Sequence, residues 1–533
     1  MEDKSGLLLP SRFVKEAAPI DYTYKYIPWS VLDGVIVPME QIIEVLRQFN
    51  RDDTIALCAN LGSLSHPSSS TGILNELIAK AAPELYERAK TLLEAGDKFF
   101  GPQAALTLAK MAIAFGEDDQ ILPIIPFHVL VGLLLLIQDH FVPLDGEKDS
   151  FQLASGLAAN YWLHKRLIPA IEYENFKQRW LGTDQTATRL RELYLQSRGV
   201  PVETVADISL TLIQIPLPQM FRFNVNRNPA DQHQENVLKS ILHLSCDAAK
   251  FKELFKSTDD FISFSMDFSD FQRFPFYERS DGRFTVLDLS MLIRRTLGWP
   301  LVNDALYPAT PVLTKSEIKG IVADVQSATE HNFSNQIIEA FGTSWSNRII
   351  EETELRRVFG GVGVKVADIA VEFPNSWLII EISALRPVYQ ALAGQSVEHY
   401  SQMIEQAVGE ARQAISTARQ FLLHADNNSL DFKEIGKEII IYPVALLTEG
   451  FPIGPIASSE IRKIVSREEG HLDGRIRPIE IINPDEFRML LGLSVKFGMS
   501  VVDLIEAKAR SNFHADSVNN FLCTEFREEI QQL

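Results

Sequence analysis

Two apolar, β-branched segments separated by Pro374-Asn375-Ser376 are the feature that most restricts how this 533-residue chain can fold. The segments are Val366–Phe373 and Trp377–Ser383. Proline suits the first central position of a tight turn because its φ is already restricted, and asparagine tolerates positive φ at the second. The two segments are therefore predicted to form a hairpin with Pro374 and Asn375 in its turn.

In such a hairpin Phe373 pairs with Ser376, and counting back along both strands places Asp368 opposite Glu381. Opposed residues share one face of the sheet, with Cβ atoms about 5 Å apart. Two carboxylates at that separation can share one hard divalent cation, whereas without a cation they raise each other's pKa. A metal site is therefore expected at Asp368 and Glu381. The alternative is a solvated strand residue at Asp368 and an edge carboxylate at Glu381.

The sequence around this hairpin alternates between helical and strand patterns. A helix is expected before the hairpin, and a long helix, a strand and further elements after it. This order is typical of an α/β domain with a mixed sheet. The expected helices are Lys315–Phe341, Val397–His424, Ser458–Val465, Pro484–Phe497 and Ser500–Ser511, and the expected strands are Val362–Phe373, Trp377–Ser383, Glu438–Leu447 and Arg477–Ile482.

From Leu313 to about Asn512 the chain resembles the PD-(D/E)XK superfamily, which includes restriction endonucleases and many bacterial defence nucleases. The resemblance rests on Asp368, on Glu381-Ile382-Ser383 and on the order of the elements around them. It implies a restriction-endonuclease-like domain in which Asp368 and Glu381 hold Mg²⁺ or Mn²⁺ for catalysis. It also implies a role in bacterial antiphage defence or a similar nucleic-acid-handling system.

Two positions depart from the pattern of this superfamily. Ser383 stands where the family has a lysine, and a neutral hydroxyl cannot supply the positive charge of that lysine. The preceding helix should carry an acid near Phe333, where the chain has Ser334 and Asn335. Glu339, six residues further on, is an alternative acid and metal ligand, although it lies on a different part of the helix circumference.

A cation from another position could replace the missing lysine. Lys365 lies three residues before Asp368 and is expected on the opposite side of a regular strand. Arg386 follows the second strand, and Arg412 lies on the long helix without a predicted position relative to the site. None of the three is predicted to complete the site. The sequence therefore favours a catalytically degenerate nuclease fold that binds a partner protein or nucleic acid; the alternative is an active metal-dependent nuclease.

The N-terminal part has helical apolar spacing, with glycines where helices are expected to end. A proline-rich stretch, Ile213–Pro229, has the composition of a linker. The chain is therefore divided into an α-helical domain (1–212), a linker with a mixed helical and aromatic-rich segment (213–312), and the restriction-endonuclease-like domain (313–533). This division makes it a multi-domain α+β protein. The expected N-terminal helices are Met39–Phe49, Thr71–Leu93, Pro102–Phe115, Phe127–Gln138 and Phe151–Leu167.

The charge balance argues against a free-standing nucleic-acid binder. The chain has 51 Lys and Arg against 70 Asp and Glu, a net charge of −19, and residues 311–533 have 21 against 31, a net −10. Binding to phosphates depends on positive charge, so nucleic acid would need a local basic groove. A protein partner or homo-oligomer is expected. A helical adaptor joined to an unrelated α/β domain is a third interpretation.

Cysteine content and apolar patterning indicate the compartment. Cys58, Cys246 and Cys523 match neither zinc-site nor disulfide spacing. The N-terminus lacks the basic and apolar regions of a signal peptide. Prolines interrupt the apolar stretch Ile121–Ile137 and leave it too short to span a bilayer, so it is expected to be a buried helix. These features predict a cytoplasmic protein without a membrane segment.

Overall fold

The chain forms two compact units, unit 1 made mainly of residues 23–318 and unit 2 mainly of residues 319–392 and 396–533. Both units contain helices and strands, so the predicted mixed α+β class is confirmed. The predicted helix Phe151–Leu167 lies outside the described residues. The computed structural model describes residues 26–65, 71–95, 97–117, 121–141, 169–215, 217–255, 267–308, 313–344, 348–359, 365–385, 397–426, 439–448, 455–469, 473–514 and 517–532.

Unit 1 is mostly helical and contains one small three-stranded sheet. Strand β1 (Ser245–Asp247) pairs in parallel with β2 (Phe276–Glu278), and β2 pairs in antiparallel fashion with β3 (Phe284–Val286). The helices are α2 (Trp29–Asp33), α3 (Met39–Leu46), α4 (Arg51–Ser65), α5 (Thr71–Ala81), α6 (Pro83–Glu94), α7 (Pro102–Phe115), α8 (Phe127–Gln138), α10 (Pro169–Phe176), the π-helix η1 (Lys177–Leu181), α11 (Gln185–Arg198), α12 (Val202–Gln214), α13 (Leu217–Met220), α14 (Gln232–His243), α15 (Ala248–Leu254), α17 (Ser269–Arg273), α18 (Leu289–Leu297) and α19 (Pro300–Leu306).

Prolines and glycines set several helix ends in unit 1. Helices α7 and α8 have the predicted bounds, and α7 starts with Pro102 at its first turn and stops before Gly116. The predicted helix Thr71–Leu93 is two helices, because Pro83 begins α6 and lacks the N–H that would continue α5. Among the described residues, no helix combines the length and the apolar character needed to cross a membrane.

The proline-rich stretch expected to be a linker packs within unit 1. Met220 and Phe221 are buried. The backbone of Phe223 exchanges two hydrogen bonds with Phe284 of β3, at 3.1 and 2.9 Å. The apolar residues between the prolines therefore tie this stretch to the small sheet.

Unit 2 is built on a five-stranded mixed sheet in the order β4-β5-β6-β7-β8. The first two pairings are antiparallel and the last two are parallel. A parallel pair needs a crossover connection, and α23 lies between β6 and β7 in the chain. The strands are β4 (Ile349–Glu351), β5 (Ile369–Phe373), β6 (Ser376–Ser383), β7 (Ile440–Leu447) and β8 (Glu480–Ile482), and the helices are α20 (Lys315–Ser344), α21 (Glu352–Phe359), α23 (Val397–Asp426), α24 (Pro455–Glu469), α25 (Pro484–Phe497), α26 (Val501–Arg510), α27 (Val518–Glu525) and α28 (Arg527–Gln532).

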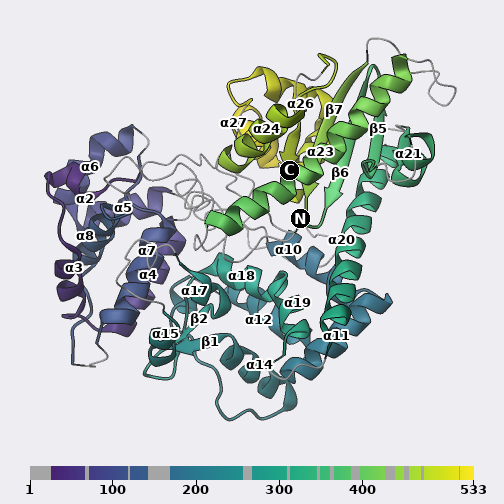
Figure 1. Ribbon diagram of the computed structural model, residues 1–533. Helices are drawn as coiled ribbons and strands as arrows, with labels where there is room; N and C mark the ends of the chain where they lie inside the picture. Colours follow the sequence, from purple (N-terminus) through teal and green to yellow (C-terminus); the bar gives the residue numbers. More distant parts are fainter. Residues whose placement is uncertain are drawn as a thin grey trace. The chain divides into compact units, whose positions relative to one another are not determined.

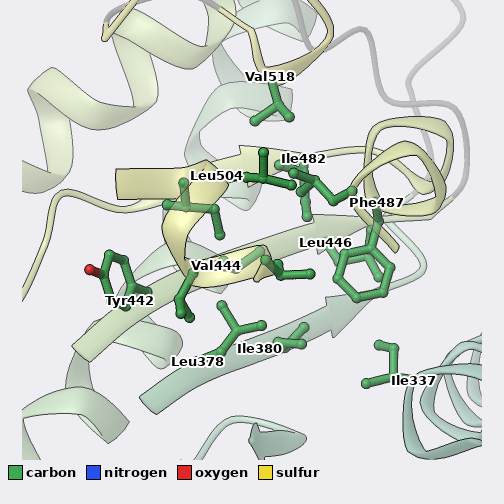
Figure 2. Packing of buried hydrophobic residues seen from close by; sticks show 14 of the residues in the cluster. Ile337, Leu378, Ile380, Tyr442, Val444, Leu446, Ile482, Phe487, Leu504 and Val518 are labelled. Carbon is green, nitrogen blue, oxygen red and sulfur yellow. The ribbon is translucent and has the colours of Figure 1, made fainter. Parts of the chain in front are cut away.

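Helices cover both faces of this sheet. Leu378 and Ile380 of β6 point into a core shared with α20, α25, α26 and α27 (Figure 2). Trp377 and Ile379 point to the other face, where they pack with residues of α21 and α23 such as Phe421. Helix α23 runs along β6 and β7 (Figure 1). Burial on both faces explains why the β6 segment is almost continuously apolar.

Candidate functional site

The hairpin predicted around Pro374 and Asn375 is present as β5 and β6. Phe373 pairs with Ser376, which confirms the predicted turn and register. Asn375 has a φ of 94°, the left-handed conformation that asparagine adopts more readily than most residues. The turn residues therefore set the register of every later pair in the hairpin.

Asp368 and Glu381 lie at the end of the hairpin that is distant from the turn. The register extends to Ile369 opposite Ile380, so the next position brings Asp368 beside Glu381. Oδ2 of Asp368 accepts a hydrogen bond from the backbone N–H of Ile382 at 2.7 Å. Glu381 is only 4% exposed. The two acids singled out in the sequence are thus brought together.

Helix α23 adds two polar side chains, Glu410 and Gln413, which share one helix face because they are three residues apart. Nε2 of Gln413 lies 2.9 and 3.0 Å from the two carboxylate oxygens of Glu381. It also donates to the carbonyl oxygen of Val366 at 2.8 Å. Glu410 lies near Glu381 and Ser383, and its interactions with both side chains lower its pKa against the larger effect of burial.

Burial keeps protons on these acids. It raises the pKa of Asp368 to about 7, against the opposing effect of the hydrogen bond from Ile382. Burial, and then the charge of Asp368, raises the pKa of Glu381. Burial also raises the pKa of Glu410. Near neutral pH the site therefore retains protons that solvent-exposed carboxyl groups would have lost.

Glu330 is the acid that helix α20 brings to this site. Its Oε1 accepts a hydrogen bond from the backbone N–H of Ala384 at 2.9 Å, and its charge contributes to the raised pKa of Asp368. Glu339, the acid expected from the sequence, is exposed. Nine residues of α-helix make about two and a half turns, so Glu330 and Glu339 point to opposite sides of α20. The expectation for Glu339 is corrected: its side of α20 is not the side that meets the site.

The three candidate cations have different surroundings. Lys365 precedes β5, outside the regular strand, so strand alternation does not determine its direction. Its charge lowers the pKa of Glu410, opposing the larger effect of burial. Arg412 is paired with Glu468. Arg386 lies outside the described residues. Of these three, Lys365 is the one whose charge acts on the described site.

The donor chemistry of the site matches a hard divalent cation, and the amide of Gln413 competes with a cation for Glu381. Asp368, Glu381 and Glu410 offer the carboxylate oxygens that Mg²⁺ and Mn²⁺ prefer. Within the described part of the chain, no group of three or more His, Cys, Asp or Glu side chains is arranged to hold a metal ion. The amide of Gln413 contacts both carboxylate oxygens of Glu381. A cation bound to Glu381 would have to displace this amide.

Glu330, Glu410 and Gln413 do not stand out in the sequence. A signal for Glu330 exists, because it lies three residues before the buried Phe333 and so faces the same side of its helix. Glu410 and Gln413 stand among the buried alanines of the long helix, where a polar side chain needs a partner. Neither pattern identifies the residue that these side chains contact.

The site thus contains four acids, one amide and one hydroxyl. Five of these side chains come from β6, α20 and α23, and the sixth is Asp368, just before β5. The predicted pair forms its centre, and α23 supplies the contacts that the hairpin alone does not. No protein-family model matches the chain, and no curated protein or solved structure matches it either.

Proposed function

We propose that unit 2 is a restriction-endonuclease-like domain of a bacterial antiphage or nucleic-acid-handling system, and that it binds a partner without cutting. The observation that carries this proposal is the contact of Gln413 with both oxygens of Glu381. A catalytic carboxylate needs those oxygens for its metal ion, and here a neutral amide from α23 takes them.

The position after Ile382 supports the same proposal. A hydrolytic site of this kind needs a cation to offset the charge of the phosphate and to orient the attacking water. Ser383 is 7% exposed, and its hydroxyl lies near Glu410, whose pKa it lowers against the larger effect of burial. Its hydroxyl is therefore engaged within the acid cluster and brings no positive charge. The cluster stabilises the end of the hairpin instead of activating water.

The net charge favours a protein as the partner. The chain carries −19 overall, and a nucleic-acid complex has to overcome repulsion between that charge and the phosphates. Binding of another protein or of a second copy of the chain has no such requirement. Nucleic acid would be bound through a local basic groove or through the partner.

An active metal-dependent nuclease is the second candidate, and the acid cluster itself favours it. Asp368, Glu381 and Glu410 gather with raised pKa values, which is the electrostatic situation that a divalent cation relieves. In that case the three carboxylates would hold Mg²⁺ or Mn²⁺. Lys365, whose charge already acts on Glu410, would replace the missing lysine.

Cleavage assays on four proteins separate the two candidates. Linear and circular DNA and RNA are incubated in Mg²⁺ and in Mn²⁺ with the wild type, the Ser383→Lys variant, the Ser383→Met variant and the Asp368→Ala/Glu381→Ala double variant. The proposal expects no cutting by the wild type. Ser383→Met matches the added length of lysine without its charge, so cutting by Ser383→Lys alone would identify the missing charge as the cause of degeneracy.

Two results would overturn the proposal. One is metal-dependent cutting by the wild type that disappears in the double variant, since it makes the domain a nuclease. The other concerns binding. The wild type and the folded double variant are both expected to assemble with themselves or with co-expressed products of neighbouring genes. Absence of any assembly by the wild type in size-exclusion chromatography would remove the binding role.

A further inference from the structure

A pocket of about 450 Å³ opens in unit 1. Its lining residues are distant in sequence from the acid cluster of unit 2. It lies between the start of α4, helix α15 and the β2–β3 hairpin, and three of its lining residues are the cations Arg51, Lys252 and Arg279. Pockets of this volume are within the usual range for small-molecule sites.

Buried hydrogen bonds hold the wall of this pocket in place. Nε of Arg51 lies 3.1 Å from the hydroxyl of Tyr277, and that hydroxyl donates to Oδ1 of Asp52 at 2.6 Å. Oδ2 of Asp52 accepts from both the backbone N–H and the hydroxyl of Ser280, each at 2.8 Å. Nη1 of Arg279 donates to the carbonyl oxygen of Asp52 at 2.8 Å. The wall is therefore pre-formed, and its two arginines have acid partners, with Arg51 3.4 Å from Asp52 and Arg279 3.0 Å from Asp53.

The acids at the pocket have partners of their own. Glu278 pairs with Arg227 at 2.7 Å. Asp247 caps α15 by accepting a hydrogen bond from the backbone N–H of Lys250 at 2.8 Å. Both acids therefore bond to groups other than the three cations that line the pocket.

Lys252 is the cation that the structure leaves available. Its side chain is exposed, and its ammonium group makes no hydrogen bond or ion pair with any described residue. Burial and then the nearby charge of Arg51 lower the pKa of Lys252, while Glu117 opposes this effect. Arg51 of α4 and Lys252 of α15 therefore face a common space. Arg51 has Asp52 as its ion-pair partner, so an anion in this space would mainly meet the charge of Lys252.

We propose that this pocket binds a small phosphorylated molecule, with its phosphate between the ammonium group of Lys252 and the guanidinium group of Arg51. A phosphate carries close to two negative charges at neutral pH and presents several acceptor oxygens, which matches two cations approaching from different helices. The hydroxyl of Ser280 and the charge of Arg279 lie on the same wall. This site extends the function of the chain beyond unit 2.

Calorimetric titration of the full chain tests the proposal, with inorganic phosphate, pyrophosphate and succinate as probes. Lys252→Gln removes the exposed charge without touching the buried wall. Lys239→Gln is the matched control, because Lys239 is an exposed lysine of α14 that pairs with Glu235. Phosphate or pyrophosphate should bind the wild type and Lys239→Gln equally, and Lys252→Gln at least about tenfold more weakly. Thermal unfolding should be the same for both variants.

Three results would overturn it. Binding of phosphate or pyrophosphate that is unchanged in Lys252→Gln would place the anion elsewhere on the protein. Succinate that binds as tightly as pyrophosphate would show a site for any dianion and not for phosphate. Heat signals absent for both phosphate probes at millimolar concentration would show that the pocket does not bind this class of ligand.

Discussion

Oδ2 of Asp368 lies 2.7 Å from the backbone nitrogen of Ile382, the residue between Glu381 and Ser383. This contact ties the residue before β5 to the last part of β6 across the open end of the hairpin. The side chain of Asp368 therefore has a structural role whether or not the site binds a metal ion. Its protonation state has consequences for stability.

The first prediction concerns pH. The pKa of Asp368 rises from 3.8 to about 7 on folding. Between pH 3.8 and about pH 7, the side chain of Asp368 therefore keeps a proton in the folded chain that it has lost in the unfolded chain. Deprotonation of Asp368 should therefore lower the stability of the hairpin as pH rises from about 4 to about 7, and the raised pKa of Glu381 should extend the fall to higher pH. Asp368→Asn should flatten this slope and stabilise the hairpin at about pH 8 by about 1–3 kcal/mol. Hydrogen exchange of the β5 and β6 amides measures both effects, and equal slopes in the two proteins would contradict the prediction.

The second prediction concerns Gln413. Gln413→Leu removes the donor to Glu381 and Val366 while keeping a similar side-chain volume, and leaves both acceptors buried without it. The free energy of unfolding should fall by about 1–3 kcal/mol. Gln406→Leu, an exposed position on the same helix, is the control and should change stability by less than about 0.5 kcal/mol. Thermal unfolding compares the two variants, and equal melting temperatures would show that the amide contributes nothing.

The third prediction concerns the buried ion pairs around Glu480. Lys508 is 1% exposed and lies 3.1 Å from one oxygen of Glu480, and Arg462 lies 2.5 Å from the other. Lys508→Met leaves a buried carboxylate with only one of its two cations, so stability should fall by about 3–5 kcal/mol. Lys463→Met, at an exposed pair with Glu460, should cost less than about 1 kcal/mol. Urea unfolding followed by circular dichroism gives both values; similar losses would argue against the special role of burial.

The fourth prediction concerns the turn. Asn375 has positive φ, which a β-branched side chain adopts only with strain. Asn375→Val should destabilise the hairpin by about 1–2 kcal/mol, whereas Asn375→Gly should be close to neutral. Limited proteolysis of unit 2 reports the difference, with faster cleavage expected for the valine variant alone. Equal protection of the two variants would mean that another contact, and not the turn, sets the register.

Local signals account for the parts of the fold that the sequence predicts well. Pro102 and Gly116 bound α7, and Asn483 with Pro484 marks the start of α25, whose bounds agree with the prediction. The register of the hairpin follows from its two turn residues. Each of these features depends on residues that are neighbours in the chain.

Long-range contacts account for what the sequence does not predict. Strand β4 is three residues long, which is too short to show the alternation of apolar and polar residues that identifies a strand. It is a strand because it pairs with β5. Gln413 meets Glu381 across 32 positions, and Glu330 meets Ala384 across 54. These contacts depend on how α23 and α20 pack on the sheet, which no local pattern encodes. Asp368 and Glu381 could be predicted to lie opposite each other because a short turn joins the two strands of the hairpin and sets their register.

The parallel pairing of β6 with β7 has a consequence for the newly made chain. The β5–β6 hairpin can form as soon as Ser383 leaves the ribosome, but the partner strand begins only at Ile440, 57 residues later. At about 5–20 residues per second, translation needs roughly 3–11 s to supply it. Throughout that interval the apolar edge of β6 has no neighbouring strand and can pair with the strands of other nascent chains. Chaperone capture during synthesis should therefore concentrate between these two points, and the emergence of β7 ends the exposure.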